Sequence, residues 1–243
     1  MHYSSKDTQK YPVFYLLDGS YTFPIAHATR TGIDIFGGLD NVIIVGISYD
    51  WEQSFQPWFI NRWTDLTPTH DTIMDKAPNA LSAVGLKKGD LKSGGADAFI
   101  EVLKKEILPF IDKNYKTNED KGISGHSLGG LFTGYCLLKE PTLFQRYGIL
   151  SPSFWWAGGK VLELEKKYAA QNQSLKAKVF IAVGNLEGPI MVSPMTSFSD
   201  SLKSRNYTGL QLTTQVFENE DHMSVIPASI SRMLKVLYSN TKK

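Results

Sequence analysis

Residues 125–129, Gly-His-Ser-Leu-Gly, have the G-x-S-x-G form of a serine held on a sharp turn between a strand and a helix. A run that favours a buried strand precedes them at 121–124, and an apolar run that favours a buried helix follows at 131–138. Such a turn projects a hydroxyl above a sheet and places it at a helix N-terminus, where free N–H groups can stabilise developing negative charge. The pattern predicts that Ser127 is a nucleophile.

A serine hydroxyl is a weak nucleophile and needs an adjacent base. Among the five histidines, His222 lies directly after the last predicted strand and before the last predicted helix. Hydrolases with the chain order serine, acid, histidine carry the base in that loop. We therefore predict His222 as the base, the alternative being a surface histidine in an acidic loop. His126, beside the serine, is interpreted as a supporting residue.

A third residue is expected to orient the imidazole and stabilise its cation. It should follow the strand that lies between serine and histidine, and Glu187 occupies that place. Glu187 is our prediction, with Asp200 and Asp221 as alternatives. A plain loop carboxylate at 187, and a serine–histidine pair without a third member, also stay open.

Ester hydrolysis passes through a tetrahedral oxyanion that backbone N–H groups can bind. The residue after the nucleophile, Leu128, is predicted to supply one N–H. The second is predicted to come from Ser20 or Tyr21, in the loop after the first strand. The alternative is that Asp18-Gly19 in this loop is simply a turn.

Three further residues are candidates for substrate binding. Trp155 and Trp156 follow the strand after the serine helix, where they could stack on an aromatic acyl group or be buried under loops. Arg62 could bind a substrate anion or pair with Asp65, and the pairing is the favoured interpretation.

The bulk composition narrows the function classes. A chain of 243 residues is long enough for one sizeable core, and we predict a single domain over residues 1–243. The net charge of +2 is too small to indicate a nucleic-acid partner. The single cysteine excludes an internal disulfide. The sequence contains no apolar run of about 18 residues, so we predict no membrane span. Neither a metal-ligand spacing nor a nucleotide-binding loop is present, so we predict no metal and no cofactor.

Strand and helix signals alternate along the whole chain. The predicted strands lie at 13–17, 41–47, 121–124, 147–150, 178–183 and 211–217. The predicted helices lie at 25–36, 99–114, 131–138, 161–170, 197–205 and 223–237. Continuous apolar strands separated by helices predict an α/β fold with a mainly parallel sheet covered on both faces. Active sites of such sheets form beyond the carboxyl ends of the strands.

One long irregular stretch, 48–95, interrupts this alternation. Loops of this length in a compact domain are usually functional or mobile. Its first half carries several large aromatic residues, and we predict that this half forms a wall of the substrate pocket. These residues are Trp51, Phe55, Trp58, Phe59 and Trp63. Residues 85–95 are predicted to be a flexible surface loop.

Five segments of the sequence resemble a known family: 11–19, 62–68, 125–130, 151–156 and 221–222. They are similar to the esterase D-like family of α/β-hydrolases over nearly the whole chain. Within that family, the stretch from the serine motif to Ser-Phe-Trp-Trp is most similar to the trilactone siderophore esterases of the enterobactin hydrolase type.

The resemblance implies the α/β-hydrolase fold, with Ser127 as nucleophile and His222 as base. It supports Glu187 less firmly, because the acid varies within the family. It also implies that Arg62 could face a catecholate substrate. Members usually carry two or more strands before the segment that matches Tyr11, so those N-terminal strands are expected to be missing here.

Together these features predict a serine carboxylesterase that acts on a small-molecule ester through an acyl-enzyme. A siderophore-type ester is the first expectation, and a feruloyl, acetyl or other small ester is the second. Acyl transfer and a non-catalytic binding protein on a hydrolase scaffold are the remaining alternatives.

Overall fold

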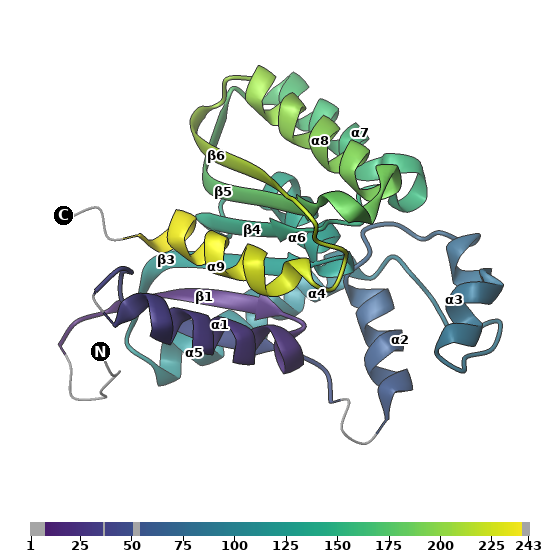
Figure 1. Cartoon of the computed structure of the whole chain (residues 1–243), viewed down its shortest axis with the longest axis horizontal. Helices are drawn as coiled ribbons and strands as arrows, with labels where there is room; N and C mark the ends of the chain where they lie inside the picture. Colours follow the sequence, from purple (N-terminus) through teal and green to yellow (C-terminus); the bar gives the residue numbers. More distant parts are fainter. Residues whose placement is uncertain (1–7, 36, 51–53, 240–243) are drawn as a thin grey trace.

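The computed structural model describes residues 8–35, 37–50 and 54–239. Its centre is a six-stranded sheet in the order β2-β1-β3-β4-β5-β6, and every neighbouring pair is parallel. The strands are β1 (Tyr11–Leu17), β2 (Ile43–Ile47), β3 (Thr117–His126), β4 (Arg146–Leu150), β5 (Ser174–Gly184) and β6 (Thr208–Phe217). Helices cover both faces of this sheet, so the predicted α/β architecture is confirmed (Figure 1).

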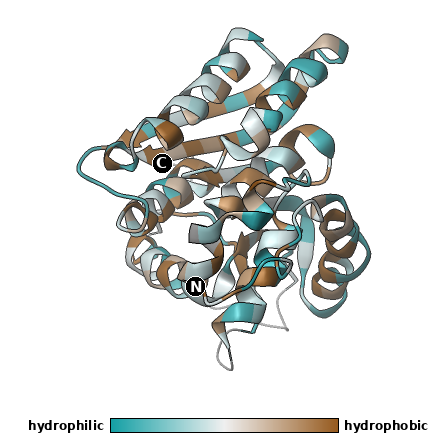
Figure 2. Cartoon of the chain, turned by 90° about the vertical axis from the view of Figure 1, so that its right-hand side faces the viewer, coloured by the Kyte–Doolittle hydropathy of each residue, from teal (hydrophilic) through white to brown (hydrophobic). Residues whose placement is uncertain are grey.

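Two helices, α1 (Gly19–Asp34) and α9 (Val225–Tyr238), lie side by side on one face (Figure 1). The other face carries the helical segments from α4 to α8. They are α4 (Ala96–Val102), the π-helical turn η2 (Leu103–Ile107), α5 (Leu108–Asn114), α6 (Leu128–Lys139), α7 (Trp156–Gln171) and α8 (Pro189–Ser204). The outer helices mix hydrophobic and hydrophilic residues, as helices with one face against a sheet must (Figure 2).

The inner strand β1 is apolar along almost its whole length because both of its faces are buried. In β1, Val13 and Tyr15 enter the core under α6, whereas Phe14 and Leu16 enter the core under α1 and α9. All four side chains are at most 1% exposed. Successive side chains of β1 thus point to opposite faces of the sheet and pack into two separate hydrophobic cores.

Helices α1, α7 and α8 begin five or more residues earlier in the chain than the sequence predicts. Each predicted start lies after a proline or glycine, Pro24, Gly159 or Pro194, and these residue types disfavour helix interiors. In the structure, α1 and α8 contain their prolines, and α7 runs through a kink with positive φ at residues 157–159. Packing against the sheet outweighs the local preference.

The insertion 48–95 is more ordered than predicted. It contains α2 (Phe55–Asp65), the 3₁₀ turn η1 (Met74–Lys76) and α3 (Pro78–Ala83), which stand beyond one end of the sheet (Figure 1). Trp51, one of its predicted wall residues, lies outside the described residues.

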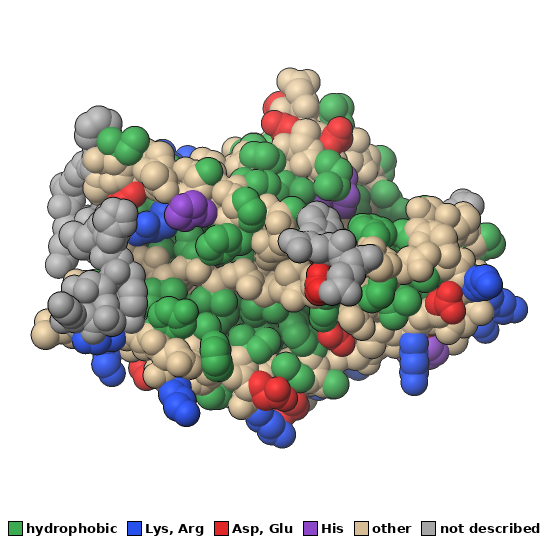
Figure 3. All heavy atoms as spheres, turned by 90° about the horizontal axis from the view of Figure 1, so that it is seen from below, with side chains coloured by type: hydrophobic (Ala, Val, Ile, Leu, Met, Phe, Trp, Pro, Cys, Tyr) green, Lys and Arg blue, Asp and Glu red, His purple; other side chains and the backbone are tan. Residues whose placement is uncertain are grey.

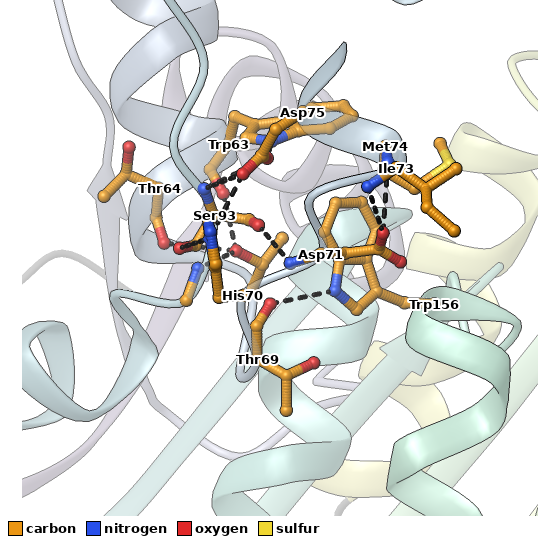
Figure 4. A network of polar contacts seen from close by, with 12 residues as sticks. Trp63, Thr64, Thr69, His70, Asp71, Ile73, Met74, Asp75, Ser93 and Trp156 are labelled. Carbon is orange, nitrogen blue, oxygen red and sulfur yellow. Dashed lines mark hydrogen bonds and ion pairs between the residues drawn. The ribbon is translucent and has the colours of Figure 1, made fainter. Parts of the chain in front are cut away.

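A buried carboxylate anchors the second half of the insertion (Figure 4). Asp75 is 4% exposed and accepts hydrogen bonds from the Trp63 indole N–H (2.7 Å) and the Ser93 N–H (3.1 Å). The Ser93 hydroxyl accepts from the Asp71 N–H (2.8 Å), and Leu91 is buried. Residues 87–90 are exposed and form no helix or strand, as expected of a surface loop, whereas the contact of Ser93 with the buried Asp75 ties the end of this segment to the core.

Within the described residues, no helix has both the length and the apolar character needed to cross a bilayer.

Candidate active site

Ser127 sits on a sharp turn between β3 and α6, as its motif predicts. Its φ of 62° and ψ of −117° form a backbone conformation that a non-glycine residue rarely adopts. Gly125 permits the turn, because a Cβ there would lie 2.3 Å from the carbonyl carbon of Gly129. The Ser127 N–H donates to the Leu150 carbonyl (3.0 Å) and its carbonyl accepts from the Ser153 N–H (3.1 Å). The neighbouring strand end thereby holds the strained residue on both sides.

His222 and Glu187 are in direct contact at the same end of the sheet. The Nδ1 of His222 lies 2.6 Å from Oε2 of Glu187, and the imidazole is partly exposed while the carboxylate is fully buried. The other oxygen of Glu187 accepts from the Ser151 hydroxyl (2.6 Å) and the Gly184 N–H (2.7 Å). These contacts can fix the ring orientation of His222 and leave its Nε2 free to face the serine.

The carboxylate of Glu187 stays ionised in this setting. Burial raises its pKa, but the hydrogen bonds from His222, Ser151 and Gly184 outweigh that effect and hold the pKa below its usual value. A buried anion beside Nδ1 is the charge that stabilises an imidazolium.

The two alternative acids lie elsewhere. Asp221 is exposed, and its carboxylate accepts from the backbone N–H groups of Met223 and Ser224, both at 2.9 Å. Asp200 forms an exposed ion pair with Lys203 on α8, at 3.5 Å.

His222 lies near the serine turn, and no hydrogen bond between His222 and Ser127 is found among the described contacts. The ring of His126, the residue before Ser127, has its centroid 4.4 Å from that of His222. The Ser127 hydroxyl itself contacts the Ser153 hydroxyl at 3.4 Å. Catalytic hydrogen bonds are often long in the absence of substrate, and a side-chain rotation of Ser127 would redirect its hydroxyl.

The buried ring of His126 lies against His222 and is held in its neutral form. It is 2% exposed, and burial above all, followed by the charges of His222 and Arg62, holds its pKa well below the usual value. A neutral ring against His222 adds no repulsion when that residue takes a proton.

The expected surroundings of Arg62 are corrected by the structure. Arg62 is 7% exposed, and its Nε and Nη2 donate to the two carboxylate oxygens of Asp18 at 2.7 and 2.9 Å. The same Nη2 donates to the His126 carbonyl (3.0 Å). The predicted pairing with Asp65 is wrong, since that carboxylate accepts from the Tyr49 hydroxyl (2.6 Å).

One of the two predicted oxyanion donors after β1 is already engaged. The segment expected to be a loop is the first turn of α1, and the Tyr21 N–H donates to the Asp18 carbonyl (3.2 Å). Tyr21 is therefore removed as a donor. Ser20, the second residue of α1, and Leu128, the first residue of α6, both occupy first-turn positions, whose N–H groups lack an intrahelical acceptor.

The tryptophan pair divides between core and surface. Trp156 is 1% exposed, its indole N–H donates to the Thr69 carbonyl (3.2 Å), and its ring meets Trp63 edge-on at 5.0 Å. Its predicted role in substrate binding is wrong, because it is a core residue under the insertion. Trp155 is partly exposed and donates to the sulfur of Met191 (3.1 Å).

An apolar rim of exposed side chains flanks Glu187 and His222 along the chain. It consists of Leu186, Ile190 and Met223, each 63% exposed. On the face drawn in Figure 3, hydrophobic side chains occupy much of the middle of the surface, and most Lys and Arg side chains lie towards the edges. Exposed apolar groups beside polar, buried ones are typical of a site for an organic ligand.

Three polar residues of the site, Asp18, Ser151 and Ser153, were not predicted as site residues. All three follow the carboxyl end of a parallel strand, β1 or β4. That position is the signal by which they could have been found.

The parallel sheet and the serine turn define an α/β-hydrolase. The model of the family described as "Putative esterase" matches residues 1–222, and the chain belongs to this family. Family membership places the chain among hydrolases that act on esters.

Individual proteins share the similarity over most of their length. The ferri-bacillibactin esterase BesA of Bacillus subtilis is 28% identical over 93% of this chain and 78% of its own. The siderophore triacetylfusarinine C esterase of Aspergillus fumigatus is 25% identical, over 99% of this chain and 86% of its own. The crystal structure of the BES protein from Bacillus cereus superposes with a TM-score of 0.80 and 31% identity, covering 97% and 86% of the two chains.

Proposed function

We propose that this protein is a serine carboxylesterase that uses Ser127, His222 and Glu187. The observation that carries the proposal is the 2.6 Å contact between His222 and a buried, ionised Glu187, beside a serine on a strained strand-to-helix turn. Burying a carboxylate costs free energy unless a partner group stabilises its charge, and here that partner is His222, the expected base.

The residues have distinct roles in this proposal. His222 takes the proton of Ser127 as the hydroxyl oxygen attacks the ester carbonyl, and Glu187 stabilises the resulting imidazolium. The N–H groups of Leu128 and Ser20 bind the oxyanion. His222 then protonates the departing alcohol, leaving an acyl-enzyme. Water, deprotonated by His222, attacks the acyl group and releases the carboxylic acid and the free serine.

Siderophore-type esters are the proposed substrates. Two proteins that resemble this chain over most of their length are named as esterases of ferri-bacillibactin and of the siderophore triacetylfusarinine C. The apolar rim and the partly exposed Trp155 suit a bulky organic substrate with aromatic or acyl groups.

Replacement of the nucleophile tests the enzyme class. We expect Ser127→Ala to abolish turnover of p-nitrophenyl acetate and labelling by a fluorophosphonate probe, since no other hydroxyl occupies the turn. Ser204→Ala, at the exposed end of α8, is the matched control and should keep both. Labelling and turnover that survive Ser127→Ala would contradict the proposal.

A substrate panel assayed with the wild-type protein tests the substrate class. The protein should show its highest kcat/KM on a catecholate trilactone or on triacetylfusarinine C, and a lower value on feruloyl and acetyl esters. A preference for feruloyl or acetyl esters would overturn the substrate class and leave the serine mechanism intact.

A further inference from the structure

Arg62 connects three parts of the site that are far apart in sequence. It belongs to α2, in the insertion, and its guanidinium spans both oxygens of Asp18 at the end of β1. Its Nη2 also donates to the carbonyl of His126, the residue before the nucleophile. The same side chain thus touches the start of α1, which carries Ser20, and the turn that carries Ser127.

Asp18 is the residue in this group that needs support. It has a left-handed backbone, with φ 54° and ψ 40°, and its side chain makes no capping bond to the helix it precedes. Asp and Asn adopt left-handed backbone more readily than other non-glycine residues, and the contacts of its side chain help to hold Asp18 in this conformation. Arg62 and the Tyr21 hydroxyl (3.1 Å) hold its carboxylate instead.

The backbone after Asp18 has little other freedom. Its carbonyl accepts from the N–H groups of Tyr21 and Thr22, which starts α1. Gly19 lies against the backbone of Gly46 in β2, where a Cβ would come within 2.7 Å. The direction of the Ser20 N–H therefore follows from the conformation of Asp18.

Arg62 already makes its hydrogen bonds within the protein, to Asp18 and to the His126 carbonyl, so it is not available as a substrate ligand. Burial lowers the pKa of Arg62, but the charge of Asp18 outweighs that effect and keeps the guanidinium charged. Both carboxylate oxygens are engaged, and the arginine is 7% exposed. A substrate anion would have to displace a buried, bidentate partner.

We infer that Arg62 is a positioning residue, which aligns the oxyanion-binding N–H of Ser20 with the Ser127 turn through its clamp on Asp18 and the His126 carbonyl. This inference rests on the proposed serine esterase function. It makes helix α2 of the insertion part of the catalytic framework and not only a wall of the pocket.

The test compares two ion pairs in the same protein. Arg62→Met alone would leave a buried unpaired carboxylate and could unfold the chain, so the informative variant is Arg62→Met with Asp18→Asn. Asparagine tolerates left-handed backbone, and neither new side chain is charged. The control is Arg205→Met with Glu165→Gln, which removes an arginine pair to another buried carboxylate, located between α7 and the end of α8.

The readouts are kcat and KM for neutral p-nitrophenyl acetate and for anionic p-nitrophenyl succinate, with the melting temperature as the folding check. We expect the folded Arg62/Asp18 variant to lose kcat on both esters by about 10- to 100-fold with little change in KM, because oxyanion alignment acts in the transition state. The Arg205/Glu165 variant should keep kcat.

Two outcomes would overturn the inference. An increase in KM confined to the succinate ester would make Arg62 an anion-binding residue. Unchanged kcat on both esters in folded protein would show that the clamp does not affect catalysis. Neither outcome concerns the serine mechanism, which the Ser127→Ala variant tests separately.

Discussion

At the scale of single residues, the site is built from groups whose charge states are fixed before a substrate arrives. Glu187 is buried and held ionised by three donors, whereas the ring of His126 is buried and held neutral. Between them, the partly exposed ring of His222 contacts both Glu187 and His126. This arrangement supports the proposed role of His222 in proton transfer.

Glu187→Gln should therefore lower kcat by about 10²- to 10⁴-fold, with KM little affected, because an uncharged amide cannot stabilise the imidazolium. Steady-state hydrolysis of p-nitrophenyl acetate measures this loss. Glu163→Gln, in an exposed ion pair on α7, is the control and should keep wild-type rates. Full activity in Glu187→Gln would mean that Ser127 and His222 work as a pair without an acid.

Chain order and the sheet edge were enough to select Ser127, His222 and Glu187 as candidates, because each follows a predicted strand. The contacts of Arg62 were not predictable in this way. Its sequence neighbour Asp65 lies one helical turn away in α2, but the partner observed is Asp18, 44 residues earlier. Pairing across such a separation depends on how the insertion packs, which local sequence does not encode.

At the scale of elements, the strands and the serine turn follow from local patterns, and the insertion does not. All six strands appear where the sequence predicts them. A strand that is buried on both faces, such as β1, is almost entirely apolar. The order of residues 63–95 depends instead on Asp75, a carboxylate whose partners come from separate segments. A polar residue inside an irregular stretch gives no sequence signal of burial.

Two glycine-to-alanine substitutions test whether the serine turn requires glycine, by comparing a glycine in the turn with a glycine in an ordinary helix. Gly125→Ala should destabilise the protein by about 3 kcal/mol or more, because its Cβ would overlap backbone atoms of Gly129 that cannot move aside. Gly32→Ala, in α1 with nothing within 4 Å of the added Cβ, should stabilise it by about 0.5–1 kcal/mol. Urea unfolding of both variants measures the contrast. Equal effects would show that the turn has room for a side chain.

At the scale of the whole molecule, buried contacts tie the insertion to two segments that are far apart in sequence. The Arg62–Asp18 ion pair joins α2 to the end of β1, and Trp156, at the start of α7, packs on Trp63 and donates to Thr69. Both ties are buried. A segment attached in this way is expected to unfold together with the sheet and not as a separate unit.

The distribution of tryptophan makes this expectation measurable. All five tryptophans lie at positions 51, 58, 63, 155 and 156, in the insertion or in the segment beneath it, whereas the helices and strands of the sheet domain dominate far-UV circular dichroism. If residues 1–243 form a single cooperative domain, tryptophan fluorescence and circular dichroism should give the same urea midpoint. Trp63→Phe removes the indole N–H that donates to Asp75 and leaves this buried carboxylate with one donor fewer. The free energy of unfolding should therefore fall by about 1–3 kcal/mol, and the urea midpoints of both signals should fall by the same amount. A fluorescence transition that precedes the circular dichroism transition would instead make the insertion a separate folding unit, and the coupling between α2 and the oxyanion-binding turn would then be lost before the sheet unfolds.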